Sequence, residues 1–266
     1  MDLSLLKAEI QKIWNRPVFE LALALVFFMA LGNVTSLFKI TILPNLQSTL
    51  TTLVAEALVR IISFQMLPLV IFCGLLVSLS FAQDYEQGVI QTLFSLPVSR
   101  ASIFIVKFVA IVIPLTLLSW GSIVFVVLLN FYSTVANTLV VLQLVTWALP
   151  ITFLAVTFYA GLAAMISLTV KRTIHSAFIT MLTGFFIWFI TQLPKETIGV
   201  LADYLIFTPF KASIVTLGRV LGVKYPETGL ENALPAWGFL VLILFYAFVF
   251  LVPTYLYFTQ KFEVKE

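Results

Sequence analysis

The sequence predicts an all-α integral membrane protein, a single transmembrane domain covering residues 1–266. Hydrophobic residues make up 61% of the chain and charged residues only 10%, whereas a soluble domain carries about 25% charged residues. The apolar runs are also continuous rather than alternating, which is typical of membrane-spanning helices and not of barrel strands. The chain therefore has too little polar surface to be covered by water.

The apolar runs divide into six segments that are each long enough to span a bilayer, which takes about 20 residues in a helix. The clearest case is the stretch 108–170, where 63 residues contain no Asp, Glu, Lys, Arg or His. This length fits two spans joined by a tight turn, which we place at the polar residues 130–137. The predicted spans are 17–38, 53–82, 103–129, 138–170, 173–193 and 235–258.

Two further segments are predicted to lie at the membrane surface. In residues 1–16 the apolar side chains recur at helical spacing with basic residues on other faces, which predicts an amphipathic interfacial helix. A cleaved signal peptide is the alternative, but Asp2 and Glu9 argue against it. Residues 194–234 are predicted to form an outer loop with short helices, because charges within its semi-apolar part (197–223) would be costly in lipid.

The Lys and Arg residues indicate the orientation. Six spans place both termini and the loops around 83–102 and 171–173 on one side of the membrane. This side carries nine of these cations and the other side six, four of them in one long loop. The bias predicts a multi-pass protein of the cell membrane with both termini in the cytoplasm. The nine are Lys7, Lys12, Arg16, Arg100, Lys107, Lys171, Arg172, Lys261 and Lys265.

The sequence proposes no catalytic, cofactor-binding or metal-binding residue. No nucleotide-binding motif or cluster of metal ligands occurs, and His175 is the only histidine. Cys73 is the only cysteine, which excludes an intrachain disulfide and suggests a buried, inert thiol. No basic run exceeds Lys171-Arg172, so nucleic-acid binding is not expected.

The predicted spans contain few charges, although ion-coupled carriers usually bury charged groups within the membrane. Only Glu56 and Arg60 approach this pattern, and their spacing suggests an ion pair at the outer end of the second span. The small residues 160–164 allow close helix packing, within the chain or against a second copy. Four prolines are candidate hinges in the spans: Pro68, Pro114, Pro150 and Pro253.

Residues 83–100 (QDYEQGVIQTLFSLPVSR) interrupt the apolar pattern with a short amphipathic helix, whose apolar positions include Val89, Leu93 and Leu96. Gly88 lowers its intrinsic stability by about 1 kcal/mol relative to Ala. Pro97 is expected to end it, and Ser99 to cap the third span. From the residues alone, an ordinary loop helix without a partner is an equal alternative.

The pattern Asp84-x-Glu86-x-Gly88, then Leu93, then Leu96-Pro97-Val98-Ser99-Arg100 and Lys107, resembles the membrane (permease) subunits of type 2 ABC transporters. The layout of spans and termini is similar over nearly the whole chain, but the similarity is specific at residue level only in 84–107. The sequence departs from the family pattern at Val89, where Thr is common, and at Gln83, where a charged residue is frequent.

The resemblance implies a permease that forms the substrate path of an exporter as a dimer, with a second permease copy or a paralogue. ATP and Mg²⁺ are expected on separate ABC ATPase subunits, so this chain would not itself be an enzyme. Residues 83–100 would be the coupling helix that docks on the ATPase, and the outer helices around 201–221 would be re-entrant elements. Asp84, Glu86 and Gly88 would form the start of the coupling helix, and Leu93, Leu96, Pro97, Ser99 and Arg100 its end.

Three other functions stay open. An ion-coupled secondary carrier would need a functional buried charge, and a membrane enzyme would need convergent acidic or histidine residues. A non-catalytic assembly factor would need only the docking helix. Loss of transport on changing Glu86 or Gly88, with assembly intact, would separate a permease from an assembly factor.

Overall fold

The computed structural model describes residues 3–38, 47–95, 97–131, 138–192, 204, 207–220 and 234–261, without the side chains of residues 29–66 and of some positions elsewhere, mainly within 126–144 and 210–220. The regular elements of this described part are all helical, which confirms the predicted all-α class. They are α1 (Leu3–Trp14), α2 (Pro17–Phe38), α3 (Gln47–Glu86), α4 (Val89–Ser95), α5 (Arg100–Phe131), α6 (Thr138–Val170), α7 (Thr173–Gln192), α10 (Pro209–Val220), α11 (Ala236–Leu256) and the π-helical turn η4 (Tyr257–Lys261).

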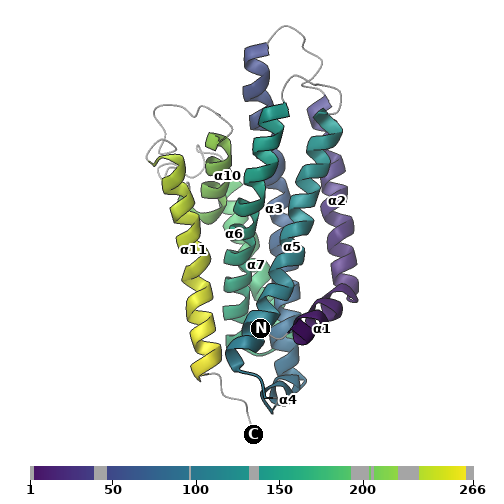
Figure 1. Ribbon diagram of the computed structural model, residues 1–266, viewed down its shortest axis with the longest axis vertical. Coiled ribbons are helices and arrows are strands. Elements are labelled where there is room, and N and C mark those ends of the chain that lie inside the picture. The colour runs from purple at the N-terminus through teal and green to yellow at the C-terminus, as the bar shows by residue number, and fades with distance from the viewer. Residues whose placement is uncertain are drawn as a thin grey trace.

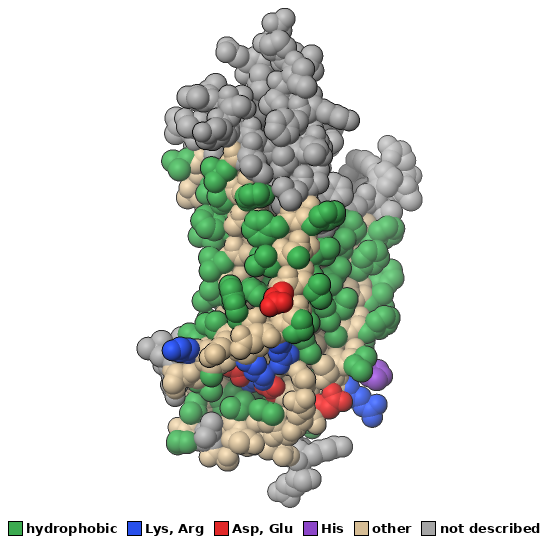
Figure 2. All heavy atoms as spheres, turned by 90° about the vertical axis from the view of Figure 1, so that its right-hand side faces the viewer, with side chains coloured by type: hydrophobic (Ala, Val, Ile, Leu, Met, Phe, Trp, Pro, Cys, Tyr) green, Lys and Arg blue, Asp and Glu red, His purple; other side chains and the backbone are tan. Residues whose placement is uncertain are grey.

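Several of these helices are suited to a lipid bilayer. Among the described residues, α3, α5, α6, α7 and α11 are each long and apolar enough to cross a membrane, and α2 contributes a shorter apolar stretch, Pro17–Phe28. Apolar side chains cover the middle of the face in Figure 2, and most charged side chains visible there gather toward one end. The chain is therefore a membrane-embedded helical protein.

The long helices run side by side along the long axis of the molecule (Figure 1). Helix α3 contacts α2, α5, α6 and α7, while α11 packs along α6 and α10. Helix α1 crosses one end of the bundle, where it contacts α5, and α4 lies at the same end. Below we call this the α4 end. The last described element, η4, also lies there.

A hydroxyl triangle fixes α3, α6 and α7 to one another inside the bundle. The Ser78 and Ser176 hydroxyls are 2.9 Å apart, those of Ser167 and Ser176 are 2.7 Å apart, and those of Ser78 and Ser167 are 3.3 Å apart. All three side chains are buried, so each hydroxyl finds its partner within the protein. Cys73 lies in the same core and is fully buried, as predicted.

The small residues 160–164 pack within the chain. A Cβ atom built on Gly161 would lie 3.1 Å from the backbone nitrogen of Leu251, so α6 and α11 approach closely there. Of the two alternatives that the sequence left open, packing within the chain or against a second copy, the structure shows the first. The four proline hinge candidates all lie inside continuous helices: Pro68 in α3, Pro114 in α5, Pro150 in α6 and Pro253 in α11.

Helix α10 is the part of the outer segment that the structure describes best. Its 12 residues extend over about 18 Å, which is too short to cross a bilayer. Ala212 and Val215 pack against Phe239 and Ile243 of α11 in a small separate core. A short helix is therefore present where the sequence predicted one. The turn 132–137, most of the outer loop 194–234 and the side chains of the predicted Glu56–Arg60 pair lie outside the described residues.

Candidate functional site

A glycine turn separates α3 from α4 at the end of the bundle. Helix α3 continues to Glu86, and α4 begins at Val89. Between them Gly88 has φ +72°, a left-handed conformation that costs a residue with a Cβ about 1–2 kcal/mol. The sequence suggested a single helix in residues 83–100, but the structure divides this segment between two helices. The first four residues of that segment are instead the last residues of α3.

Helix α4 has one buried face and one exposed face. Ile90 is 1% exposed, and Leu93 and Phe94 pack partly buried against the core. The centroid of the Phe94 ring lies 5.6 Å from that of Phe258, so α4 contacts η4. Its outer face carries the exposed residues Val89, Gln91, Thr92 and Ser95.

The segment after α4 leads directly into α5. Leu96 lies outside the described residues, and Pro97 is exposed beyond the end of α4. The Ser99 hydroxyl accepts a hydrogen bond from the backbone N–H of Ser102 at 3.2 Å, which confirms the predicted N-cap of α5. The Arg100 guanidinium lies 4.6 Å from the centroid of the Phe94 ring.

Glu86 connects the end of α3 to the start of α7. Its Oε2 accepts hydrogen bonds from the Thr173 hydroxyl at 2.6 Å and from the Thr173 backbone N–H at 3.1 Å. These bonds, the hydroxyl bond first, lower the pKa of the exposed Glu86 carboxyl below its ordinary value. The carboxylate thus satisfies a free N–H at the N-terminus of α7, where the helix dipole also favours a negative charge.

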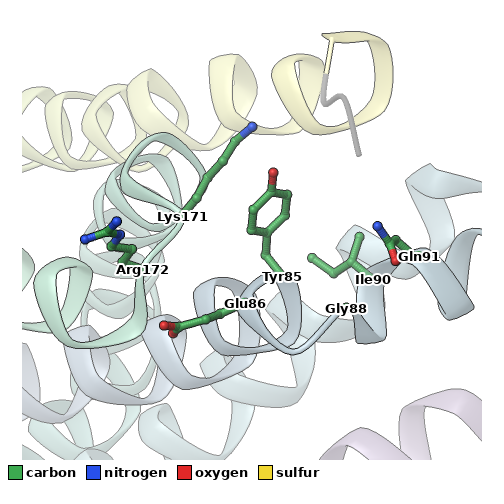
Figure 3. A pocket seen from close by; sticks show the side chains of 7 residues that line it. All are labelled: Tyr85, Glu86, Gly88, Ile90, Gln91, Lys171 and Arg172. Carbon is green, nitrogen blue, oxygen red and sulfur yellow. The ribbon is translucent and has the colours of Figure 1, made fainter. Parts of the chain in front are cut away.

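A cavity of about 360 Å³ opens between this turn, α4 and the connection from α6 to α7. Figure 3 shows its lining: Tyr85, Glu86, Gly88, Ile90, Gln91, Lys171 and Arg172. The Lys171 ammonium lies 4.9 Å from the centroid of the Tyr85 ring. Lys171 itself has φ 58°, a left-handed conformation at the end of α6. Charged and apolar groups therefore meet where α4 adjoins the rest of the bundle.

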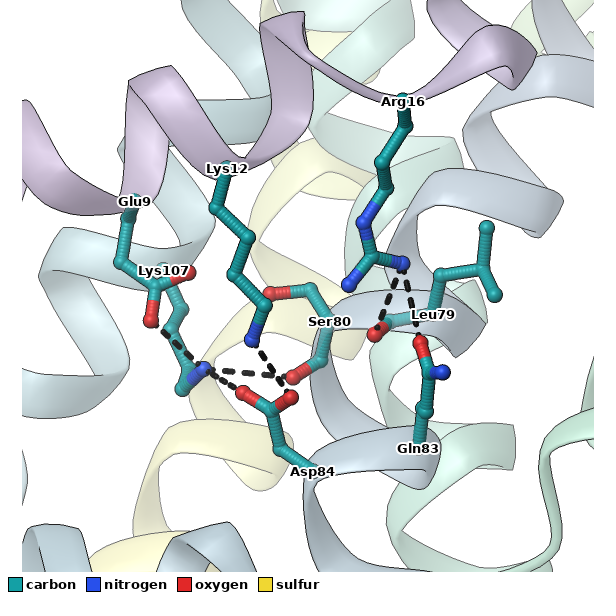
Figure 4. A network of polar contacts seen from close by, with 8 residues as sticks. All are labelled: Glu9, Lys12, Arg16, Leu79, Ser80, Gln83, Asp84 and Lys107. Atoms are coloured by element: carbon teal, nitrogen blue, oxygen red, sulfur yellow. Dashed lines mark hydrogen bonds and ion pairs between the residues drawn. The ribbon is translucent and has the colours of Figure 1, made fainter. Parts of the chain in front are cut away.

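A cluster of charged residues lies just inside this end and joins α1, α3 and α5 (Figure 4). We call Glu9, Lys12, Arg16, Asp84 and Lys107 the charge cluster. The Lys107 ammonium donates to Asp84 Oδ2, to Glu9 Oε1 at 2.9 Å and to the Ser80 carbonyl at 3.2 Å. Lys12 donates to Asp84 Oδ1 at 2.6 Å. Arg16 donates to the Leu79 carbonyl at 3.2 Å and to Gln83 Oε1 at 3.0 Å.

The centre of the charge cluster is shielded from solvent. The Lys107 and Asp84 side chains are each 1% exposed and that of Glu9 is 8% exposed. All three protons of the Lys107 ammonium have acceptors, and two of these acceptors are carboxylates that balance its positive charge. Glu9 Oε2, in contrast, is buried without a hydrogen-bond partner among the described residues. Such a cluster holds together only while every charge keeps its partner.

The acidic residues that the sequence grouped together point in different directions. Asp84 and Glu86 are two residues apart on α3, which places them about 200° apart around the helix. Asp84 therefore enters the charge cluster, and Glu86 reaches α7. Buried Asp84 is not available for a surface contact with a partner protein. The sequence placed Asp84 at the start of the coupling helix, and its role in coupling stays a prediction; the residue itself lies near the end of α3.

Sequence reasoning missed the charge cluster. It counted Lys107 among the cations of the cytoplasmic side and found almost no charge within the bundle, whereas Lys107 is buried between three helices. One signal was available, because a lysine seven residues inside an apolar helix needs a partner. The choice of Glu9 and Asp84 as its partners depends on how α1 folds back over α3 and α5.

Neither the protein-family models nor the curated proteins gave a match to this sequence.

Proposed function

We propose that this chain is the membrane subunit of an ATP-driven transporter of the type 2 ABC kind, an exporter whose ATPase is a separate protein. The observation that carries the proposal is α4. This short helix lies outside the apolar bundle, buries Ile90 against it and leaves Val89, Gln91 and Thr92 exposed. A helix so placed presents a surface to a soluble partner while staying in contact with the membrane helices.

The contacts of α4 supply a route from such a partner to the spans. Movement of α4 acts on α3 through the turn at Gly88 and on η4 through the contact of Phe94 with Phe258. Glu86 extends the connection from α3 to α7. The charge cluster adds α1 and α5, since Lys107 holds Glu9 and Asp84 at once. Force on a seven-residue helix would thus reach most of the bundle.

The proposed docking surface is smaller than the sequence motif, because several residues of the motif make contacts within the chain. Asp84 is buried, Ser99 caps α5 and Glu86 caps α7, so each has a role within the chain. The proposed contact with the ATPase therefore lies on the exposed face of α4: Val89, Gln91, Thr92 and Ser95.

The proposal includes the six-span layout, in which α2 is the first span, and it places the α4 end in the cytoplasm. The substrate path then lies between this chain and a second permease copy. ATP and Mg²⁺ bind to the partner ATPase. The apolar character of α5, α6 and α11 supports the placement in the bilayer.

The proposal is tested by comparing Val89→Glu with Ile174→Glu. Val89 is 36% exposed on α4, and Ile174 is 81% exposed at the start of α7, at the same end. We expect Val89→Glu to reduce the ATPase that co-purifies with the chain, because it places a charge in the contact surface. Ile174→Glu should leave the amount unchanged. Equal loss, or no loss, in the two variants would contradict the proposal.

The charge cluster favours a second function, an ion-coupled carrier. Carriers enclose charged groups of this kind, and Glu9 is buried with one carboxylate oxygen that has no hydrogen-bond partner among the described residues. Proteoliposomes containing this chain alone provide the test. Proton flux in the absence of any ATPase, abolished in Glu9→Gln, would favour the carrier; its absence in intact protein would favour the ABC subunit.

A further inference from the structure

An apolar groove of about 470 Å³ runs between α5 and α11, with α6 as its floor. Helix α11 packs along α6 and reaches α5 at the α4 end, where Phe104 contacts Tyr255 at 5.7 Å and Phe258 at 5.5 Å. These aromatic rings close the lower end of the groove. Above them, within the part of the chain that the structure describes, α6 lies between the two walls.

The groove offers no polar group to a ligand. Two lining residues carry a hydroxyl, Thr157 and Tyr255, but the surface that the groove presents is entirely apolar. The Thr157 hydroxyl donates to the Phe153 carbonyl at 2.8 Å within α6. The inner wall includes Phe104 and Phe108, which are buried, and the rim includes Ile105 and Phe248, which are 42% and 53% exposed. The groove is therefore open on its outer side to whatever surrounds the membrane helices.

The length of the groove matches one leaflet of a bilayer. From Phe104 to Ile113 the α5 wall includes ten residues, and the nine steps between them extend over about 14 Å at 1.5 Å each. Half of a hydrocarbon core of about 30 Å is about 15 Å. Arg100 is exposed one turn before Phe104, at the height where the phosphate of a lipid from this leaflet would lie.

The size of the groove limits its occupant. A helix with its side chains is about 10–12 Å across. A single hydrocarbon chain is narrower and needs no hydrogen-bonding partner. We infer that the groove binds one acyl chain of a membrane phospholipid from the leaflet at the α4 end, with its phosphate near Arg100.

The test uses the full chain in lipid nanodiscs that contain a phosphatidylcholine with a photoreactive diazirine in the middle of one acyl chain. Labelled peptides are then identified by mass spectrometry. A bound chain should label the groove segments 104–113 and 247–255 on the order of tenfold more than the exposed face of α7 around Phe185 and Phe189.

Two variants of α5 make the comparison specific. Val109 is half-buried in the groove, so Val109→Trp should fill it and lower labelling of the groove on the order of tenfold. Leu117 is 53% exposed on the same helix outside the groove, so Leu117→Trp should leave the labelling unchanged. If Val109→Trp does not fold, the comparison between groove and α7 in the unaltered chain still decides.

Equal labelling of the groove and of α7 would overturn the inference, because it would show only lipid exchanging around the protein. Labelling that survives in folded Val109→Trp would overturn it too. The inference would also be overturned if the lipid probe did not label the groove and the groove cross-linked to a second copy of the chain instead. The experiment needs no ATPase, so its outcome is independent of the proposed transport function.

Discussion

Replacing Lys107 with methionine is the sharpest test of the charge cluster. Methionine keeps most of the side-chain length but leaves Glu9 and Asp84 without their shared cation. Lys107 makes two charge-assisted hydrogen bonds to these carboxylates, each worth about 1.5–3 kcal/mol. Removing one member of a buried ion pair typically costs about 3–5 kcal/mol. Since the Lys107 side chain is 1% exposed, we expect the full cost of about 3–5 kcal/mol.

The assay is the thermal midpoint of the purified chain in detergent, followed by loss of the monodisperse peak in size-exclusion chromatography. For a chain of this size the expected cost corresponds to a fall on the order of 10 °C. Neutralising the stranded carboxylates, in Lys107→Met with Glu9→Gln and Asp84→Asn, should recover about half of the loss or more. The matched control is Lys7→Met, since Lys7 is exposed on the same α1 helix as Glu9. A midpoint for Lys107→Met equal to that of Lys7→Met would refute the reasoning.

Three further substitutions test the packing and the turns. Gly161→Ala should lower the thermal midpoint at a cost of about 1–3 kcal/mol, because the added methyl meets the α11 backbone. Gly121→Ala is the control: its methyl enters open space, so the variant should be neutral or slightly stabilising. Similar midpoints for the two variants would refute the expected difference. Gly88→Ala should speed hydrogen exchange in α4 and cost about 1–2 kcal/mol, with Gly88→Asn milder, since only the left-handed backbone opposes a side chain there. Glu86→Ala should speed exchange at the start of α7, and Thr173→Val should do so less, because it keeps the backbone N–H bond to Glu86; the double variant should match Glu86→Ala alone. Because the Glu86 pKa is lowered, this cap is present above the unfolded-state pKa and is lost as the pH falls through the lowered value. Additive effects in the double variant would show that the two residues act separately.

The helices could be located from sequence because lipid demands long apolar segments. Helix α2 has the bounds of the predicted segment 17–38, and α6 those of 138–170. Helix α3, in contrast, runs from Gln47 to Glu86 where 53–82 was predicted. Hydrophobicity marks only the part of a helix that suits the bilayer, and polar residues at both ends of α3 continue the same helix.

The candidate site was harder to predict, because it depends on contacts between distant segments. The sequence located α4, the end of that helix before Pro97 and the Ser99 cap, which are local features. It did not reveal that Gly88 breaks the segment, since glycine is compatible with both helix and turn. It also did not reveal that Lys107 and Glu9, 98 positions apart, share a hydrogen bond. Such a contact depends on how α1 crosses the end of the bundle and packs against α5.

We propose that α4 docks on a separate ATPase. Isolation of the chain from its native membrane in mild detergent tests this most directly. The proteins that co-purify are identified and counted by mass spectrometry. The proposal predicts a soluble subunit with nucleotide-binding motifs, about as abundant as this chain. A chain that purifies without such a subunit, under conditions that keep other ABC complexes intact, would contradict it.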